Sequence, residues 1–143
     1  MMRISYAGLA VLGFVLCDES AVQATRPQAN RPATAQGDAG AGRVLFNGKG
    51  VCYYCHGVDG HLSKRPELAA DTAALIARLN PPSADLRNSK RLRLKNDKQR
   101  GQAVREGHPG TGMFPDTTMT SQELADILAY LALIRKEGAA APQ

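Results

Sequence analysis

Residues 52–56 read Cys52-Tyr53-Tyr54-Cys55-His56, and this short stretch carries most of the information in the chain. Two thiols stand three positions apart, and an imidazole follows the second thiol directly. Cys-x-x-Cys-His is the attachment pattern of a c-type haem. Each thiol can add to one vinyl group of the porphyrin, while the histidine turns its ring onto the iron. The pattern therefore predicts one covalently bound haem c held by Cys52, Cys55 and His56.

Two other uses of the same residues are open. Cys52 and Cys55 could form a local disulfide, but this ring would be strained and would leave His56 without a role. A zinc site is a poorer alternative, because two cysteines and one histidine within five residues cannot surround a tetrahedral ion without a distant fourth ligand. Haem attachment uses all three side chains in their observed order.

The first 24 residues have the features of a secretory signal peptide. Arg3 provides a basic start, an apolar stretch runs from Ala7 to Cys17, and small residues lead up to Ala24. This stretch is shorter than the roughly 20 apolar residues of a membrane-spanning helix. We therefore expect cleavage after Ala24, a periplasmic location and no stable membrane insertion, with an uncleaved anchor as the alternative. Cleavage also removes Cys17, which leaves both remaining thiols in the haem motif.

The remainder divides into a flexible linker, residues 25–38, and one domain, residues 39–143. The linker is rich in Pro, Ala and polar residues without apolar periodicity. Four helices are predicted within the domain. The first helix is capped by Asp38 and runs to about Asn47, and the second covers 67–79 after Pro66. The third covers 96–106 and begins with a capping box of Asn96 and Gln99. The last begins with a capping box of Thr120 and Glu123 and ends near Lys136 and Gly138. No segment has a strand pattern, so the predicted fold class is all-α.

Composition and charge add two expectations. Aromatic residues make up only 5% of the chain, so the core is modest and a buried porphyrin would supply missing apolar area. The formal net charge is +5, and basic residues gather between positions 87 and 105. They are either a solvated face or a docking surface for an acidic redox partner. Nucleic-acid binding is not expected of an exported haem protein whose basic stretch lacks interleaved aromatics. The basic residues of this stretch are Arg87, Lys90, Arg91, Arg93, Lys95, Lys98, Arg100 and Arg105.

From Ala41 to Arg135 the chain resembles the class I cytochromes c of the small bacterial type. The resemblance rests on Gly42-x-x-x-Phe46, the Cys52–Gly57 motif, the Leu79–Leu86 segment with two prolines, the Gly107–Phe114 loop and Leu128–Leu131. It implies a cytochrome c-like fold of about four helices around one covalent haem. It also implies that the first and last helices cross at Gly42, with Phe46, Ile127 and Tyr130 packed around the crossing. The carbonyl of Pro81 or Pro82 would then fix the His56 ring.

The sixth iron ligand has four candidates. Met113 lies in a Gly/Pro-rich loop between two helices, where the family resemblance implies the axial methionine. Met119 precedes the Thr120 cap and can form a hydrophobic staple with Leu124. The histidines His61 and His108 are expected to be solvated surface residues. His56 and Met113 are the predicted iron ligands.

A His/Met pair favours ferrous iron and leaves no position for a substrate. The predicted function is therefore that of a monohaem carrier of single electrons between periplasmic redox partners, not of an enzyme. Two alternatives stay open: an electron-transfer subunit of a larger dehydrogenase or oxidase, and a peroxidase-like haem enzyme. The second needs an accessible iron and an acid/base group, for which the sequence offers only His108.

Overall fold

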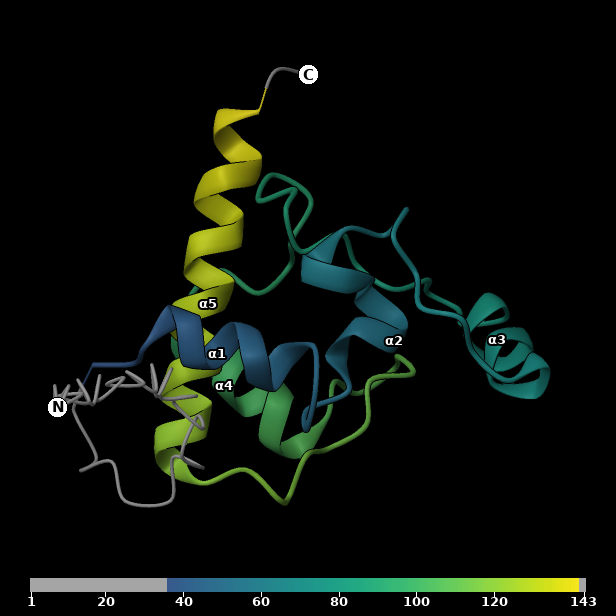
Figure 1. Ribbon diagram of the computed structural model, residues 1–143, viewed down its shortest axis with the longest axis horizontal. Coiled ribbons are helices and arrows are strands. Elements are labelled where there is room, and N and C mark those ends of the chain that lie inside the picture. Colours follow the sequence, from purple (N-terminus) through teal and green to yellow (C-terminus); the bar gives the residue numbers. More distant parts are fainter. Residues whose placement is uncertain (1–35, 142–143) are drawn as a thin grey trace, which may run out of the picture. The chain divides into compact units, whose positions relative to one another are not determined.

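The computed structural model describes residues 36–141, which form helices joined by loops (Figure 1). Across this range there is no strand, and the predicted all-α class is confirmed. No helix in the same range has the length and apolar character needed to cross a membrane. The predicted signal peptide and most of the predicted linker lie outside the described residues.

In chain order the elements are α1 (Ala39–Phe46), α2 (Cys52–His56), the 3-10 turn η1 (Val58–Gly60), α3 (Ala70–Ala77), α4 (Asp97–Glu106) and α5 (Ser121–Ala140).

The first and last helices, α1 and α5, cross at close range, as predicted (Figure 1). A side chain on Gly42 would bring its Cβ to 2.0 Å from the carbonyl oxygen of Asp126 and 2.8 Å from Cβ of Tyr130. The rings of Phe46 and Tyr130 pack edge to face beside the crossing, with their centroids 5.4 Å apart. Only glycine at position 42 allows this close approach of the two helices.

The core lies around this crossing. Phe46, Ile127 and Ile134 are each about 1% exposed, and Tyr130 is 2% exposed. Val104 from α4, Met119 and Leu131 complete the buried apolar cluster. The core residues proposed from the sequence, Phe46, Ile127 and Tyr130, are all confirmed.

The helix starts follow the predicted caps. Asp38 accepts a hydrogen bond from the amide of Ala41 at 3.0 Å and begins α1. Capping boxes begin α4 at Asn96 and α5 at Thr120, with both reciprocal bonds formed in each. Gly107, with a φ of +76°, ends α4 in the left-handed region.

The predicted end of α5 near Lys136 and Gly138 is wrong, because the helix continues to Ala140. Gly138 does not terminate it. A Cβ at this position would lie 2.1 Å from the carbonyl oxygen of Arg87. The glycine therefore serves a close contact between the C-terminal part of α5 and the segment that contains Arg87.

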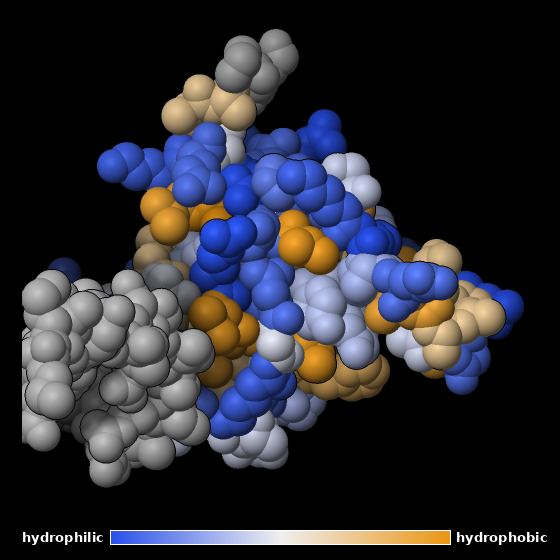
Figure 2. Space-filling view, in the orientation of Figure 1, coloured by the Kyte–Doolittle hydropathy of each residue, from blue (hydrophilic) through white to orange (hydrophobic). Residues whose placement is uncertain are grey.

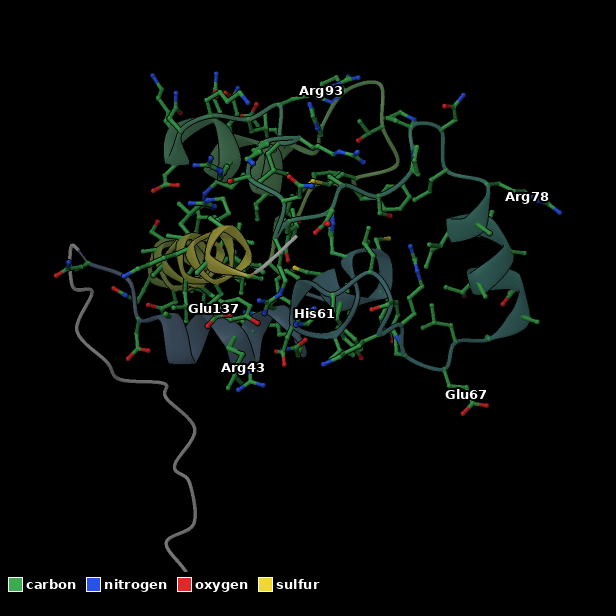
Figure 3. The ribbon with its side chains drawn as sticks, turned by 90° about the horizontal axis from the view of Figure 1, so that it is seen from above. Arg43, His61, Glu67, Arg78, Arg93 and Glu137 are labelled. Atoms are coloured by element: carbon green, nitrogen blue, oxygen red, sulfur yellow. The ribbon has the colours of Figure 1, made fainter. Side chains whose placement is uncertain are left out.

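The predicted helix over 67–79 is shorter than expected. α3 begins only at Ala70, after Ala69, and no side chain caps it. It contains no buried residue, and Leu75 is 67% exposed. Both ribbon views draw α3 apart from α1 and α5 (Figures 1 and 3), and the hydropathy view shows apolar surface over it (Figure 2). With no buried residue in α3 and no side-chain cap, helix propensity alone does not sustain the first predicted turn.

Candidate haem-binding site

The haem motif occupies a helical turn of its own, α2, which the sequence did not predict as a separate helix. Residues with positive φ stand on both sides of this turn: Val51 at +44° before it, and Gly57 at +78° and Asp59 at +55° after it. A left-handed conformation at a β-branched residue such as Val51 is unusual and costs about 1–3 kcal/mol. The chain thus bends sharply on entering and leaving α2, which places both cysteines and His56 on one compact turn.

Both cysteines of the motif are free thiols in the structure, so the alternative of a local disulfide is not formed here. The thiol of Cys52 is held by a contact of 3.3 Å with the carbonyl oxygen of Gly50. Burial raises the pKa of the Cys52 thiol to about 11, so this side chain stays protonated at neutral pH. Cys52 also packs against the core cluster, which fixes one attachment point relative to the α1–α5 crossing.

The His56 ring is oriented by one hydrogen bond. Its Nδ1 lies 2.9 Å from the carbonyl oxygen of Ala84. The acceptor is therefore neither Pro81 nor Pro82, which were the two residues expected to fix the ring. Burial lowers the pKa of His56, which favours the neutral ring. With Nδ1–H donated to Ala84, the lone pair lies on Nε2, where no protein group among residues 36–141 binds it. This tautomer is the one that can ligate iron.

A polar junction at Asp59 connects α2 to the helix crossing. The Asp59 carboxylate accepts bonds from Arg43 at 2.6 and 2.8 Å, from Asn47 at 2.7 Å and from the Tyr130 hydroxyl at 3.0 Å. The bond from Arg43 is the largest influence that holds the pKa of Asp59 well below its usual range. Burial, together with the bond to Asp59, raises the pKa of Tyr130 to about 12. The junction joins α1, α5 and the turn that follows His56.

The Asp59→Asn variant is expected to be less stable than the wild type by about 2 kcal/mol at pH 7, because hydrogen bonds to a charged group are lost. The native pKa of Asp59 is depressed, so the contribution of Asp59 is fully present above the unfolded-state pKa of about 4 and is lost progressively as pH falls from there toward the native pKa. Urea unfolding of both matured proteins between pH 7 and pH 3 measures this. A difference in unfolding free energy that stays constant over this range would contradict the assignment.

Met113 lies in the loop between α4 and α5, outside the core, with 36% of its surface exposed. The loop is held by its own bonds: the amide of His108 donates to the carbonyl of Met113 at 3.1 Å, and the amide of Met113 donates to the Thr111 hydroxyl at 3.1 Å. A Cβ at Gly112 would lie 2.2 Å from a methyl group of Leu79, so the loop packs on the segment after α3. The thioether is thus carried on a fixed backbone while its side chain is not committed to the core.

The other three candidate ligands have different surroundings. Met119 is 4% exposed and belongs to the core cluster, against which Leu124 packs, in agreement with the staple interpretation. His61 and His108 are both partly buried, so neither is the fully solvated side chain expected from the sequence. Within residues 36–141 no group of three or more His, Cys, Asp or Glu side chains could hold a metal ion.

The comparisons with known proteins agree with this geometry. The family model described as Cytochrome c matches residues 39–134, about two thirds of the chain. The chain belongs to the cytochrome c family. No curated protein and no solved structure matched it. Cytochromes c bind covalently attached haem c, usually one per domain, and most are electron carriers.

The residues present fit a haem c. Two free thiols and a neutral imidazole with an available Nε2 share one turn, and the neighbouring loop offers a thioether. Two residues that organise this site, Asp59 and Ala84, were not recognised from the sequence as site residues. Ala84 acts through its backbone and so leaves no signal in residue type.

Proposed function

We propose that this cytochrome c is a monohaem carrier of single electrons, with His56 and Met113 as the two axial ligands. The observation that carries the proposal is the contrast between the two methionines. Met119 is buried among Phe46, Ile127 and other core residues, whereas Met113 stands on a fixed loop outside the core. Moving Met119 to the iron would open a cavity in the core, while the Met113 side chain can move without opening one.

Bound haem supplies a one-electron couple between ferric and ferrous iron. The protein's part is to keep both ligands in place in both oxidation states. Ala84 holds the His56 ring through Nδ1, and the bonds of His108 and Thr111 hold the Met113 backbone. Because these supports are backbone groups or short local bonds, they leave the two ligand residues little freedom to reorganise. With His56 and Met113 as its ligands, a bound haem would offer no open position to an exogenous ligand.

Carbon monoxide tests this proposal against the peroxidase-like alternative. The reduced, matured protein is expected to show no change in its absorption spectrum under carbon monoxide at neutral pH, because Met113 fills the sixth position. A carbon monoxide spectrum in the wild type, together with turnover of peroxide, would support a haem enzyme instead.

We also propose that the carrier works in the periplasm and docks to an acidic partner through part of the basic stretch. The structure divides the eight basic residues into two groups. Arg87, Arg100 and Arg105 are partly buried and donate hydrogen bonds within the protein. The other five are exposed and, within the described residues, form no ion pair: Lys90, Arg91, Arg93, Lys95 and Lys98. This exposed group is the surface available for docking.

The Arg93→Glu variant is expected to transfer electrons to an acidic electron-transfer protein about three- to tenfold more slowly at low ionic strength, and the difference should shrink as salt is added. Stopped-flow oxidation at several salt concentrations measures this. Lys136→Glu is the matched control, because Lys136 is also exposed, lies on α5 and undergoes the same change of charge. Equal effects of the two substitutions would mean that net charge alone matters, and the docking surface would be abandoned.

A further inference from the structure

Ala84, whose carbonyl accepts the hydrogen bond from His56, lies close to Arg87 in the chain. Ala84 lies in a loop between α3 and α4, and its carbonyl directly precedes a turn closed by the bond from the amide of Asn88 to the carbonyl of Asp85 at 3.2 Å. The Asp85 carboxylate also accepts a bond from the amide of Arg87 at 3.0 Å. Ala84 and Arg87 are therefore rigidly connected by this turn.

The Arg87 side chain reaches from this turn to two other elements. Its Nε donates to the carbonyl oxygen of Asp59 at 2.9 Å, and its Nη1 forms an ion pair with Glu137 of α5 at 2.9 Å. Only 17% of the side chain is exposed. Figure 3 labels Glu137 near Arg43 and His61, at the opposite side of the view from Arg93. Unlike the exposed residues of the basic stretch, Arg87 is thus bonded to both η1 and α5.

Two glycines lie beside Arg87, Gly138 next to its carbonyl group and Gly60 next to its side chain. A Cβ at Gly138 would lie 2.1 Å from the Arg87 carbonyl oxygen, and a Cβ at Gly60 would lie 3.9 Å from Cγ and Nε of the side chain. On the other side, Arg87 lines a polar cavity of about 550 Å³ together with His61 and Asp85. The backbone of Arg87 therefore packs closely on α5, while its side chain lies beside a polar cavity.

These contacts close a ring of hydrogen bonds around the proximal ligand. His56 binds Ala84, the turn links Ala84 to Arg87, and Arg87 binds the carbonyl of Asp59. Asp59 lies three residues after His56 in η1, where the amide of Gly60 donates to the carbonyl of Gly57 at 2.9 Å. The distance between the His56 ring and its acceptor is therefore set by where Arg87 holds the two segments.

We propose that Arg87 is a positioning residue for the proximal haem ligand, which fixes the hydrogen bond from His56 Nδ1 to the Ala84 carbonyl. The proposal rests on the proposed function, because it assigns to Arg87 the tuning of the same iron site. A shorter bond from Nδ1 makes the imidazole a stronger donor and favours ferric iron, and a loosened bond favours ferrous iron. Arginine suits this role because its planar, rigid fork holds two acceptors in a fixed geometry, whereas the lysine ammonium is a single point charge on a flexible stem.

The test uses the Arg87→Lys variant of the matured holoprotein, which keeps the positive charge but loses the fork. We expect the Nδ1 proton of His56, followed by NMR in the ferrous protein, to exchange with water about tenfold faster than in the wild type. The ferric/ferrous equilibrium should also shift about threefold toward ferrous iron, where a tenfold shift corresponds to 59 mV for one electron. If Arg87 only stabilised the fold, the potential would not change, and proton exchange would accelerate only as much as global unfolding does. Urea unfolding measures that contribution separately.

Arg100→Lys is the matched control. Arg100 belongs to the same basic stretch, is 14% exposed and pairs with Asp97 at 2.8 Å, but it has no contact with the His56 supports. If Arg87→Lys and Arg100→Lys give the same exchange rate and potential, the proposal is overturned.

A second variant keeps the proposal testable if Arg87→Lys does not retain haem. Glu137→Gln leaves Arg87 and its bond to Asp59 in place and removes only the ion pair on α5. It should also speed the exchange of the Nδ1 proton, by a smaller factor, and an unchanged rate would refute the proposed role of Arg87. A wild-type protein without covalent haem would instead refute the proposed function, so the two failures are distinguishable.

Discussion

The Met113→Ala variant is expected to lose the iron–sulfur bond while keeping its fold. The ferric protein should lack the weak absorption band at the red end of the spectrum that marks this bond, and the ferrous protein should bind carbon monoxide. The reduction potential should fall by an amount on the order of a few tenths of a volt, because the thioether no longer favours ferrous iron. Apart from the lost iron–sulfur bond, the loss of Met113 packing should change stability by less than about 1 kcal/mol, since Met113 is 36% exposed and outside the core.

Met119→Ala is the matched control for this change. Met119 is 4% exposed, and a Cβ at Gly50 would lie 2.7 Å from its terminal methyl group. Its truncation should leave the red band and the potential unchanged but reduce the free energy of unfolding by about 2–5 kcal/mol. Loss of the band in Met119→Ala and its retention in Met113→Ala would reverse the ligand assignment.

The Gly42→Ala variant is expected to lose about 3 kcal/mol of stability, which for a domain of this size threatens folding altogether. The added methyl group would stand 2.0 Å from the Asp126 carbonyl oxygen, and backbone atoms cannot move aside as a flexible side chain can. The α1–α5 crossing must therefore open, and Phe46 and Tyr130 lose their packing. Urea unfolding of the matured protein, or the yield of matured protein if it does not accumulate, measures this.

Gly101→Ala provides the control with the opposite sign. Gly101 is also a buried glycine inside a helix, but a Cβ there would meet only side-chain atoms of Leu124 and Leu128, at 3.6 and 3.5 Å. Alanine should fill this space and raise stability by up to about 1 kcal/mol, because it favours the helix over the unfolded chain. If Gly42→Ala and Gly101→Ala lower the free energy of unfolding equally, the close approach of the two helices does not explain why position 42 is a glycine.

The sequence predicted those parts of the fold that depend on local chemistry. Asp38, Asn96 and Thr120 begin their helices where their side chains accept backbone amides, and such caps are read from three or four neighbouring residues. The helix crossing at Gly42 was expected because the chain resembles class I cytochromes c, and Gly42-x-x-x-Phe46 is one of the motifs that carry this resemblance. The haem attachment residues were recognised directly, since their chemistry lies in residue type and spacing.

The parts that the sequence did not give depend on contacts between distant segments. Glycine often marks the end of a helix, but Gly138 is a glycine because the Arg87 carbonyl lies too close to it for a side chain. Ala84 binds His56 through a main-chain oxygen, which any residue could provide. Arg87 lies among other basic residues, and only the structure separates its buried bonds from their exposed charges.

The central claim is that one haem, held by this chain at both axial positions, carries one electron at a time. The most direct measurement is a spectroelectrochemical titration of the matured holoprotein, followed in the visible and near-infrared. We predict a single reversible one-electron transition between two low-spin, six-coordinate forms. A high-spin spectrum in either oxidation state would contradict the account, as would the absence of a one-electron transition.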